Sequence, residues 1–482
     1  MKNKKLLTNY IYNTLYQILV LIAPLVTIPY VSRVLGVTNI GIYQYSQSIA
    51  TYFVLIGAGG VSIYGQREIA YLQDKRQERT KAFGEIEVFH IFSVLLLVII
   101  YAFTFFSFGK YKSVYQILII EIIASAFDIS WFFMGMENFK STVLRNTVIK
   151  FAGVILVFLL VKTSNDLLTY TACLTIPILA GNISLWISLN KYIDRTHIDV
   201  SVLVSGVVKR LKPILILFIP QIAIEVYTVL DKTMLGIFAT NIDQVGFYSQ
   251  AQRIVRLILT IVTSLGTVML PSMSAAFANK DNIKIVESFK VAFRFIFLLS
   301  AALMFGLCAI ASRFVPVFFG EGYDPVILLL VVISPVIMII ASSNIISYQF
   351  LLPTGRQRQF TISILLGASV NFLLNIILIH FYDAVGASIA TIIAELTVTG
   401  TQCWLVRKEI PIKNALLSGV KYLFYGAIMF LAVSGVGMLL PAEKIWALAV
   451  MIIIGVIVYM GELLLTKDPM VKMGLGLIKK KA

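Results

Sequence analysis

The run LGIFATNIDQVGFYSQAQRI, residues 235–254, decides the fold because LGVTNIGIYQYSQSI, residues 35–49, repeats its pattern. Both runs read Leu-Gly, a short polar hinge, Gly, an apolar residue and Tyr, followed by a helical pattern, and the second copy has five extra hinge residues. Each copy follows a stretch with two prolines and precedes, one helix later, a charged amphipathic stretch (67–85 and 276–293). Two Gly-Tyr segments can resemble each other by chance, but the agreement of prolines, hinge and charged stretch favours an internal repeat.

The composition around this repeat is that of an integral membrane protein. The chain has 482 residues, of which 59% are hydrophobic and only 13% are charged, and its mean hydropathy is +0.90. Soluble domains carry about 25% charged residues, so water could not solvate this much apolar surface. The basic N-terminus leads into an apolar run with Pro24 and Pro29 deep inside it and no small-residue cleavage site, which indicates a retained first helix rather than a signal peptide.

Apolar stretches long enough to cross a bilayer recur along the whole chain. A spanning helix needs about 20 mostly apolar residues. The sequence predicts fourteen such helices joined by short connectors: 9–32, 40–63, 86–108, 113–135, 143–162, 167–190, 212–238, 246–271, 290–312, 325–352, 360–381, 385–406, 415–440 and 444–465.

The positive charges follow the topology of these spans. The formal net charge is +16, from 40 Lys and Arg residues against 24 Asp and Glu. With the N-terminus in the cytoplasm, the outer loops hold only Lys110, Lys112, Lys162, Arg313 and Lys444. Four more cations lie in or at the outer ends of helices, and all others lie at or near the cytoplasmic side. Cytoplasmic loops are enriched in Lys and Arg, so we expect both termini in the cytoplasm and read the basic balance as topology rather than nucleic-acid binding.

The repeat and the span count together predict the architecture. The fold class is an all-α polytopic membrane protein of about 14 transmembrane helices, with two six-helix lobes in a pseudo-two-fold repeat and two C-terminal helices. Because six is even, both halves enter the membrane from the same side, related by an axis along its normal, with a cavity between them. The predicted boundaries are 1–200 and 201–410 for the lobes, and 411–482 for the two extra helices and a basic cytoplasmic tail.

Two arginines stand inside the predicted span 246–271. Arg253 lies about 10 Å and Arg256 about 15 Å below its outer end, and both share one helical stripe with Thr260, Thr263 and Thr267. A central arginine costs about 2.5–3.5 kcal/mol to insert, so the pair is expected to face water or a partner. With Lys150, Arg33 and Lys232 they form the predicted cationic lining for an anionic substrate, since arginine binds phosphate bidentately. Alternative roles stay open: Arg33 and Lys232 could snorkel to the interface, Lys150 could reach the cytoplasmic edge, and Arg253 could form a structural bridge with Glu225.

Four acidic residues inside predicted spans are candidates for ion coupling or counter-charge: Glu225, Asp128, Glu121 and Glu395. For each of the last three, packing or hydrogen bonding is favoured over an ion site. The isolated cysteines Cys173, Cys308 and Cys403 fit core positions, and the three histidines show no ligand spacing, so the sequence predicts no metal, cofactor or catalytic group.

Several motifs resemble a known family. The run NFLLNIILIHFYDAVGASIATIIAE (371–395) is similar to the Asn…Asn…Gly-Ala…Ala-Thr…Glu signature of bacterial polysaccharide exporters, and FFGEGYDP (318–325), LLPTGRQRQF (351–360) and the two repeat hinges also fit. The chain is identified on these motifs as a member of the Wzx-type oligosaccharide flippases, relatives of the lipid II flippase and the MATE multidrug exporters in the MOP superfamily.

The resemblance implies a transporter of the bacterial cell membrane. Its implied cargo is an undecaprenyl-diphosphate-linked oligosaccharide, turned from the cytoplasmic to the outer leaflet by alternating access for capsule or O-antigen assembly. Polysaccharide polymerase and chain-length machinery are the implied partners. One departure stands out: Ser48 and Thr51 occupy the positions that the repeat pairs with Arg253 and Arg256, so the cationic lining is lopsided toward the second lobe.

Two other functions remain as alternatives. A MATE-like drug or cation antiporter would favour an acidic cavity and twelve helices, whereas this chain has arginines in its spans and fourteen predicted helices. A membrane polymerase or glycosyltransferase generally needs a large outer loop or an Asp-x-Asp motif, and the sequence has neither. We therefore expect a transporter and not an enzyme.

Overall fold

The computed structural model describes residues 2–194, 200–278, 282–410, 412–441 and 444–471, and these form long helices that divide into two compact units, Met1–Gly236 and Ile237–Ala482. Ten helices in the described ranges are long and apolar enough to cross a membrane. Two of these, Ile22–Tyr71 and Gln357–Val406, each cover two predicted spans, and the two remaining predicted spans lie in α8 and α9. Each of the fourteen predicted ranges therefore falls on helix, and the all-α polytopic prediction is confirmed. The lobe boundaries at 200 and 410 stay predictions.

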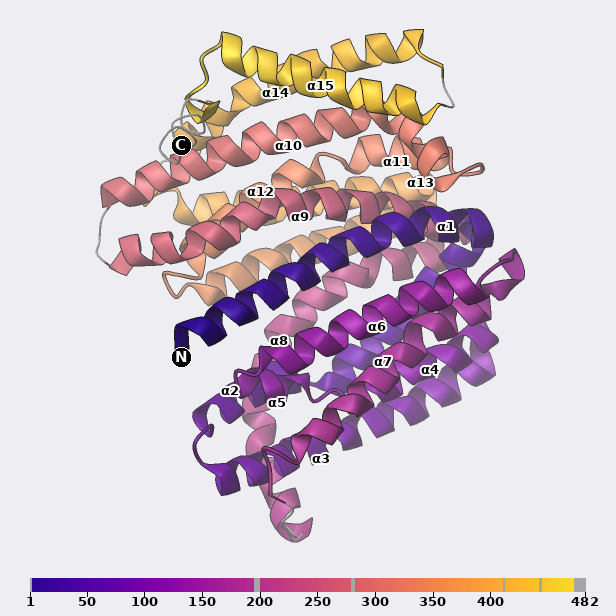
Figure 1. Ribbon diagram of the computed structural model, residues 1–482, viewed down its shortest axis with the longest axis vertical. Helices are drawn as coiled ribbons and strands as arrows, with labels where there is room; N and C mark the ends of the chain where they lie inside the picture. Colours follow the sequence, from indigo (N-terminus) through magenta and orange to yellow (C-terminus); the bar gives the residue numbers. More distant parts are fainter. Residues whose placement is uncertain (1, 195–199, 279–281, 411, 442–443, 472–482) are drawn as a thin grey trace. The chain divides into compact units, whose positions relative to one another are not determined.

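The first unit contains eight of the described α-helices (Figure 1). They are α1 (Lys2–Ala58), α2 (Val61–Tyr71), α3 (Arg76–Tyr101), α4 (Lys112–Ala126), α5 (Ser130–Gly135), α6 (Phe139–Leu160), α7 (Leu167–Leu189) and α8 (Val200–Phe238). A π turn, Ala102–Phe106, extends α3. Helices α4, α6 and α7 pack side by side, and α1 contacts α3, α4 and α6.

The second unit contains the remaining α-helices of the described chain. They are α9 (Asp243–Ala278), α10 (Asn282–Phe319), α11 (Pro325–Ile333), α12 (Val336–Ile346), α13 (Gln357–Val406), α14 (Ile412–Leu439) and α15 (Ile445–Leu465). Helix α9 packs against α10, α11, α12 and α13. Helices α14 and α15 lie against α10, as Figure 1 shows.

Local chemistry sets where the long helices bend. In α1 the chain breaks its helical path at Gly36, with φ 76° and ψ 169°, a conformation that glycine adopts without a Cβ penalty. This is the Leu-Gly hinge of the first repeat copy. In the second copy α8 ends at Phe238 and α9 begins at Asp243, so a four-residue loop, 239–242, takes the place of the one-residue break.

Two predicted spans are each built from two helices. The range 113–135 is interrupted at 127–129 between α4 and α5, and the range 325–352 is interrupted at Ser334 and Pro335 between α11 and α12. Proline lacks the N–H that continues a helix, which accounts for the second break. The first break places Asp128 where its half-exposed carboxylate lies 3.3 Å from the Arg145 guanidinium.

A buried carboxylate ties the end of α15 to α14. The Asp468 side chain is fully buried and accepts hydrogen bonds from Lys421, from the Tyr422 hydroxyl at 3.0 Å and from the backbone N–H of Met470 at 2.8 Å. Burial alone would raise the pKa of Asp468, but the Lys421 ammonium and the hydrogen bonds outweigh it and hold this pKa below its usual value. The carboxylate therefore stays ionised at neutral pH and fixes the chain after α15.

Candidate functional site

The predicted arginine stripe lies on α9. This helix buries Tyr248, Ala251, Val255 and Val262 in its own unit, each at 2% exposure or less. The stripe lies on its less covered side, where Arg253 is half-buried and Arg256 is exposed. Neither guanidinium is fully buried, so neither lies in a dry seam between packed helices.

The hydroxyls of Thr260 and Thr263 form hydrogen bonds within α9 itself. The Thr260 hydroxyl donates to the Arg256 carbonyl at 2.9 Å, and the Thr263 hydroxyl donates to the Leu259 carbonyl at 3.0 Å. Such bonds one turn back along the helix make no demand on a neighbouring element. The side chain of Thr267 lies outside the described residues.

A second polar group joins α9 to α13. The Tyr248 hydroxyl lies 3.1 Å from the Thr391 hydroxyl, and the Gln252 amide donates to Tyr248 at 3.3 Å. Glu395, one turn beyond Thr391, is 9% exposed. These contacts make the α9–α13 face a hydrogen-bonded packing surface. Glu395 stays a candidate counter-charge on it.

In the first unit, Lys232 of α8 contacts α1. Its ammonium donates to the Gln44 amide oxygen at 2.9 Å, and Gln44 is 2% exposed. One residue later, the Thr233 hydroxyl lies 2.8 Å from the Ser48 hydroxyl and donates to Tyr52 at 3.1 Å. The position that the repeat pairs with Arg253 is therefore used to hold α8 against α1, which gives the predicted lopsidedness a structural reason.

The other predicted site residues of this unit lie on four helices. Arg33 on α1 and Lys150 on α6 are exposed, and Glu225 on α8 is half-buried. Glu121 on α4 accepts a hydrogen bond from the Gln47 amide of α1 at 3.3 Å. This arrangement does not show whether these residues contact a substrate. Their roles in binding or counter-charge stay predictions.

Asp128 meets an arginine that sequence reasoning left out. The Arg145 guanidinium of α6 lies 3.3 Å from the Asp128 carboxylate and donates to Asn182 of α7 at 2.7 Å and to Asn146 at 2.6 Å. The Arg145 side chain is 9% exposed, so an ion pair and two amides stabilise a nearly buried cation. Arg145 is the third residue of the predicted span 143–162, and a cation at that place in a span could have marked it as a paired group.

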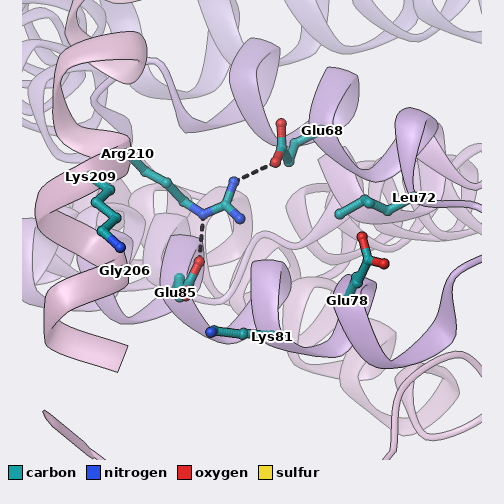
Figure 2. A pocket seen from close by; sticks show the side chains of 8 residues that line it. All are labelled: Glu68, Leu72, Glu78, Lys81, Glu85, Gly206, Lys209 and Arg210. Carbon is teal, nitrogen blue, oxygen red and sulfur yellow. Dashed lines mark hydrogen bonds and ion pairs between the residues drawn. The ribbon is translucent and has the colours of Figure 1, made fainter. Parts of the chain in front are cut away.

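A polar cavity opens where α8 enters the first unit, at the end that the charge pattern predicts to be cytoplasmic. Figure 2 shows its lining, with Arg210 between two carboxylates. The cavity measures about 440 Å³ and is lined by Glu68, Leu72, Glu78, Lys81, Glu85, Gly206, Lys209 and Arg210. Three acidic and three basic side chains thus share this space.

Arg210 is the central group of the cavity. It contacts Glu68 of α2 and Glu85 of α3, each at 2.6 Å, and donates to the Tyr64 hydroxyl at 2.9 Å. Burial opposes its charge, but these bonds raise the pKa of Arg210 above its ordinary value, so the guanidinium stays cationic. Glu68 and Glu85 both belong to the charged amphipathic stretch 67–85, which the sequence analysis singles out. Their partner Arg210 is far away in sequence, so the pairing is not visible from that stretch.

Glycines allow α8 to come this close. A Cβ at Gly206 would collide with the Glu85 carboxylate. At Gly60, where φ is 80°, a Cβ would lie 2.9 Å from the Ile214 carbonyl. Beneath the cavity, Tyr64, Phe83, Trp131 and Ile214 belong to one buried apolar cluster. The ion pairs and this cluster together anchor the start of α8 to α2 and α3.

The sequence of this helical protein matches a known family model over residues 6–277, described as polysaccharide biosynthesis protein. The chain belongs to the polysaccharide biosynthesis protein family. It is 24% identical over 410 residues to the "Putative O-antigen transporter" of Escherichia coli (strain K12), covering 83% of this chain and 96% of that protein. A protein of the same name from Shigella dysenteriae is 23% identical over 393 residues, covering 78% and 93%.

Solved structures share the fold of this family member. The structure of "Lipid II flippase MurJ, inward closed conformation" has a TM-score of 0.76 at 17% identity and covers 96% of this chain and 99% of its own. An inward-facing multidrug resistance MATE family transporter of the MOP superfamily has a TM-score of 0.56 at 13% identity, covering 86% and 98%. The family match and the O-antigen transporter relatives confirm the resemblance to bacterial polysaccharide exporters, and these two structures show that the chain shares their fold.

The described part of the chain contains no candidate metal site. No group of three or more His, Cys, Asp or Glu side chains there is arranged to hold a metal ion.

Proposed function

We propose that the chain is a flippase that moves an undecaprenyl-diphosphate-linked oligosaccharide from the cytoplasmic to the outer leaflet of the bacterial cell membrane. The proposal rests on membership of the polysaccharide biosynthesis family, and two relatives named as O-antigen transporters support it. A transporter of this kind needs no catalytic group. The observation that carries the proposal is the pair Arg253 and Arg256 on α9, which keeps two guanidinium groups out of dry packing in a segment predicted to cross the membrane.

The chemistry of the cargo fits these groups. A diphosphate carries negative charge that arginine binds through paired N–H donors, and such charge-assisted bonds are stronger than neutral ones. The sugars carry hydroxyls, for which the threonines and amides of the spans offer partners. The cationic set Arg253, Arg256, Lys150, Arg33 and Lys232 would take the diphosphate. The acids Glu225, Asp128, Glu121 and Glu395 would supply counter-charge or ion coupling.

The movement would follow alternating access between two lobes. In repeat transporters one bundle rocks against the other around a site near the membrane midplane. Within the first unit, the Gly36 hinge would permit bending, whereas the anchored start of α8 would resist it. Delivery to a polysaccharide polymerase and chain-length machinery, for capsule or O-antigen assembly, would follow in the outer leaflet.

A flipping assay in proteoliposomes tests the proposal. Purified protein is reconstituted with a labelled undecaprenyl-diphosphate-linked oligosaccharide, and the fraction open to an impermeant sugar-modifying reagent is followed with time. Vesicles without protein and vesicles loaded with a cationic dye serve as controls. We expect label to cross only with protein present. Dye export without lipid movement would instead favour a MATE-like antiporter.

A further inference from the structure

The second arm of α13 (residues 384–406, after the break at Asp383) carries a stripe of exposed side chains. Ile393 and Leu396 are 39% and 52% exposed, and Trp404 is 61% exposed. The exposed positions 393, 396, 400, 404 and 407 recur every three or four residues, so they share one face of the helix. This face is apolar as far as Trp404 and cationic at Arg407, the residue after the last helical position.

The length of this stripe matches one leaflet of a bilayer. At a rise of about 1.5 Å per residue, the distance from Ile393 to Arg407 along the helix is about 21 Å. Half of a hydrocarbon core is about 15 Å thick, so a stripe that starts inside the core reaches the headgroups. Tryptophan is enriched at that boundary because its ring is apolar and its N–H is polar. The stripe therefore presents an acyl-chain surface, an interfacial ring and a cation, in that order.

The Arg407 guanidinium is ordered by the Trp404 side chain and backbone. Its central carbon lies 4.3 Å from the centroid of the indole ring, and one N–H donates to the Trp404 carbonyl at 2.9 Å. Within the described chain, no carboxylate pairs with Arg407 or with its neighbour Lys408. A guanidinium stacked on an aromatic face keeps its edge N–H groups for a planar or tetrahedral oxyanion such as phosphate.

Glu409, the only acidic residue in the stretch 404–414, is already paired with another arginine. It accepts two hydrogen bonds from Arg356, which precedes α13, at 2.5 and 2.6 Å. The exposed cations that remain at this corner are Arg407, Lys408 and Lys413. Because the Glu409 charge is met by Arg356, these three side chains keep an unbalanced positive charge next to the exposed indole.

Buried contacts hold the second arm in place behind its exposed stripe. The Gln402 amide donates to the Ser363 hydroxyl of the first arm at 3.0 Å, and both residues are fully buried. A Cβ at Gly367 would lie 2.3 Å from the Val398 side chain, so the two arms pack as closely as a glycine allows. The stripe is therefore carried by a helix whose opposite face is fixed.

We propose that this corner of the second unit binds an anionic phospholipid of the cytoplasmic leaflet. The headgroup phosphate accepts paired N–H groups from Arg407, Lys408 adds positive charge, and an acyl chain lies along the apolar part of the stripe. Cations just outside a span attract anionic lipids, and the ring contact makes Arg407 the group that binds the phosphate with a defined geometry. The inference goes beyond the proposed function, because this lipid is not the cargo and no transport is needed to detect it.

Lipid binding is measured by native mass spectrometry of the purified full-length protein. The protein is titrated with phosphatidylglycerol or with phosphatidylcholine of matched acyl chains, and wild type should bind the anionic lipid more tightly. Arg407→Ala should weaken phosphatidylglycerol binding about tenfold, since it removes hydrogen bonds between two charged groups. Arg407→Lys keeps the charge but loses the planar fork, and should recover only part of the affinity. Thermal unfolding checks that each variant is folded.

The matched control is an arginine at the same end of the first arm. Cations gather at the cytoplasmic ends of spans for reasons of topology alone, so the control must carry the same charge without the ring. Arg358 is exposed, and it contacts no aromatic ring and no carboxylate among the described residues. Arg358→Ala should leave the affinity for phosphatidylglycerol nearly unchanged. Equal losses in Arg358→Ala and Arg407→Ala would show that only overall charge attracts the lipid, and would overturn the site.

Two further arms distinguish this lipid from other phosphates. Excess inorganic phosphate should not displace phosphatidylglycerol, because it cannot use the apolar stripe. Displacement would mean that the corner binds a free anion, and the lipid site would be wrong. A labelled undecaprenyl-diphosphate-linked oligosaccharide should bind equally well to wild type and Arg407→Ala. If Arg407→Ala weakens binding of that lipid and leaves phosphatidylglycerol binding intact, the corner receives the cargo and the phospholipid proposal fails.

Discussion

Two arginines in predicted spans show how differently a cation can be accommodated in a membrane helix. Arg145 is 9% exposed and is held by Asp128, Asn146 and Asn182, so its charge is neutralised inside one unit. Arg256 is exposed on α9, a helix that buries Tyr248, Ala251 and Val255. The first arrangement stabilises a fold. The second keeps a guanidinium out of dry packing, and its role in ligand binding stays a prediction.

Replacing Arg256 should therefore affect transport more than folding. Arg256→Ala is expected to lower affinity for the diphosphate lipid by about ten- to hundredfold, since hydrogen bonds to charged groups contribute roughly 1.5–3 kcal/mol. Binding and flipping are measured in proteoliposomes, and protein level and thermal unfolding in detergent are followed in parallel.

Two further variants separate charge from geometry in that experiment. Arg256→Lys keeps the charge but loses the planar fork, and should recover only part of the affinity. Arg358→Ala removes an exposed arginine at the start of α13 and should leave transport unchanged. Wild-type flipping by a stably produced Arg256→Ala protein would remove this residue from the site.

At the scale of the helix, hydropathy predicts where spans exist better than where they break. The apolar runs were sufficient to locate all fourteen. The turn at Asp128 was not foreseen, because a run of apolar residues continues on both sides of it. Pro335 was a usable signal for the break between α11 and α12, and the Leu-Gly hinge pattern did indicate the bend at Gly36.

Pairings between helices were harder to foresee than the helices themselves. The charge pattern places Arg210 at the predicted cytoplasmic side, yet its partners Glu68 and Glu85 lie more than a hundred residues away in sequence. A charge count uses such residues as topology markers and says nothing of their contacts. Asp383 is similar: it interrupts α13 with φ 47° and accepts two hydrogen bonds from Thr240, at 2.8 and 2.9 Å. Only a folded chain reveals either contact.

The anchored start of α8 yields a stability prediction. Arg210→Met leaves Glu85, whose side chain is 5% exposed, without its cation, and should lower the free energy of unfolding by about 3 kcal/mol or more. The triple change Arg210→Met with Glu68→Gln and Glu85→Gln removes all three charges and should recover much of that loss. Thermal unfolding of purified protein in detergent measures both.

Gly206 offers an independent test of the same contact. Gly206→Ala should destabilise the protein because the new Cβ displaces the Glu85 carboxylate. Gly153→Ala is the matched control, since its Cβ would meet only the Cys173 carbonyl at an ordinary 3.5 Å. Equal unfolding temperatures for the two variants would show that the close approach of α8 to α3 does not contribute to stability.

At the scale of the whole molecule, the two copies of the repeat share a backbone pattern but differ in the side chains at matching positions. Both copies place a glycine hinge before a Gly-x-Tyr helix, but Ser48 lies 2.8 Å from Thr233 where the second copy has Arg253. The first unit uses that position to hold α8, and the second leaves it cationic. If the two halves are duplicated, as the sequence predicts, the proposed cationic lining would come mainly from the second half.

The predicted arrangement of spans determines the side of the membrane on which the C-terminus should lie. The fourteen predicted crossings would return the chain to the side where it begins, and the concentration of Lys and Arg in alternate loops predicts that this side is the cytoplasm. A fluorescent protein fused after Lys481, which lies beyond the described residues, should therefore fluoresce, and an alkaline phosphatase fusion at the same point should be inactive.

Cysteine labelling tests the loops between the spans, after Cys173, Cys308 and Cys403 are replaced. An impermeant thiol reagent should label Glu321→Cys in intact cells and Arg358→Cys only after the membrane is opened. Labelling of Arg358→Cys from outside would mean that one span before it is miscounted, and the cationic stripe on α9 would then need a different depth and a different ligand.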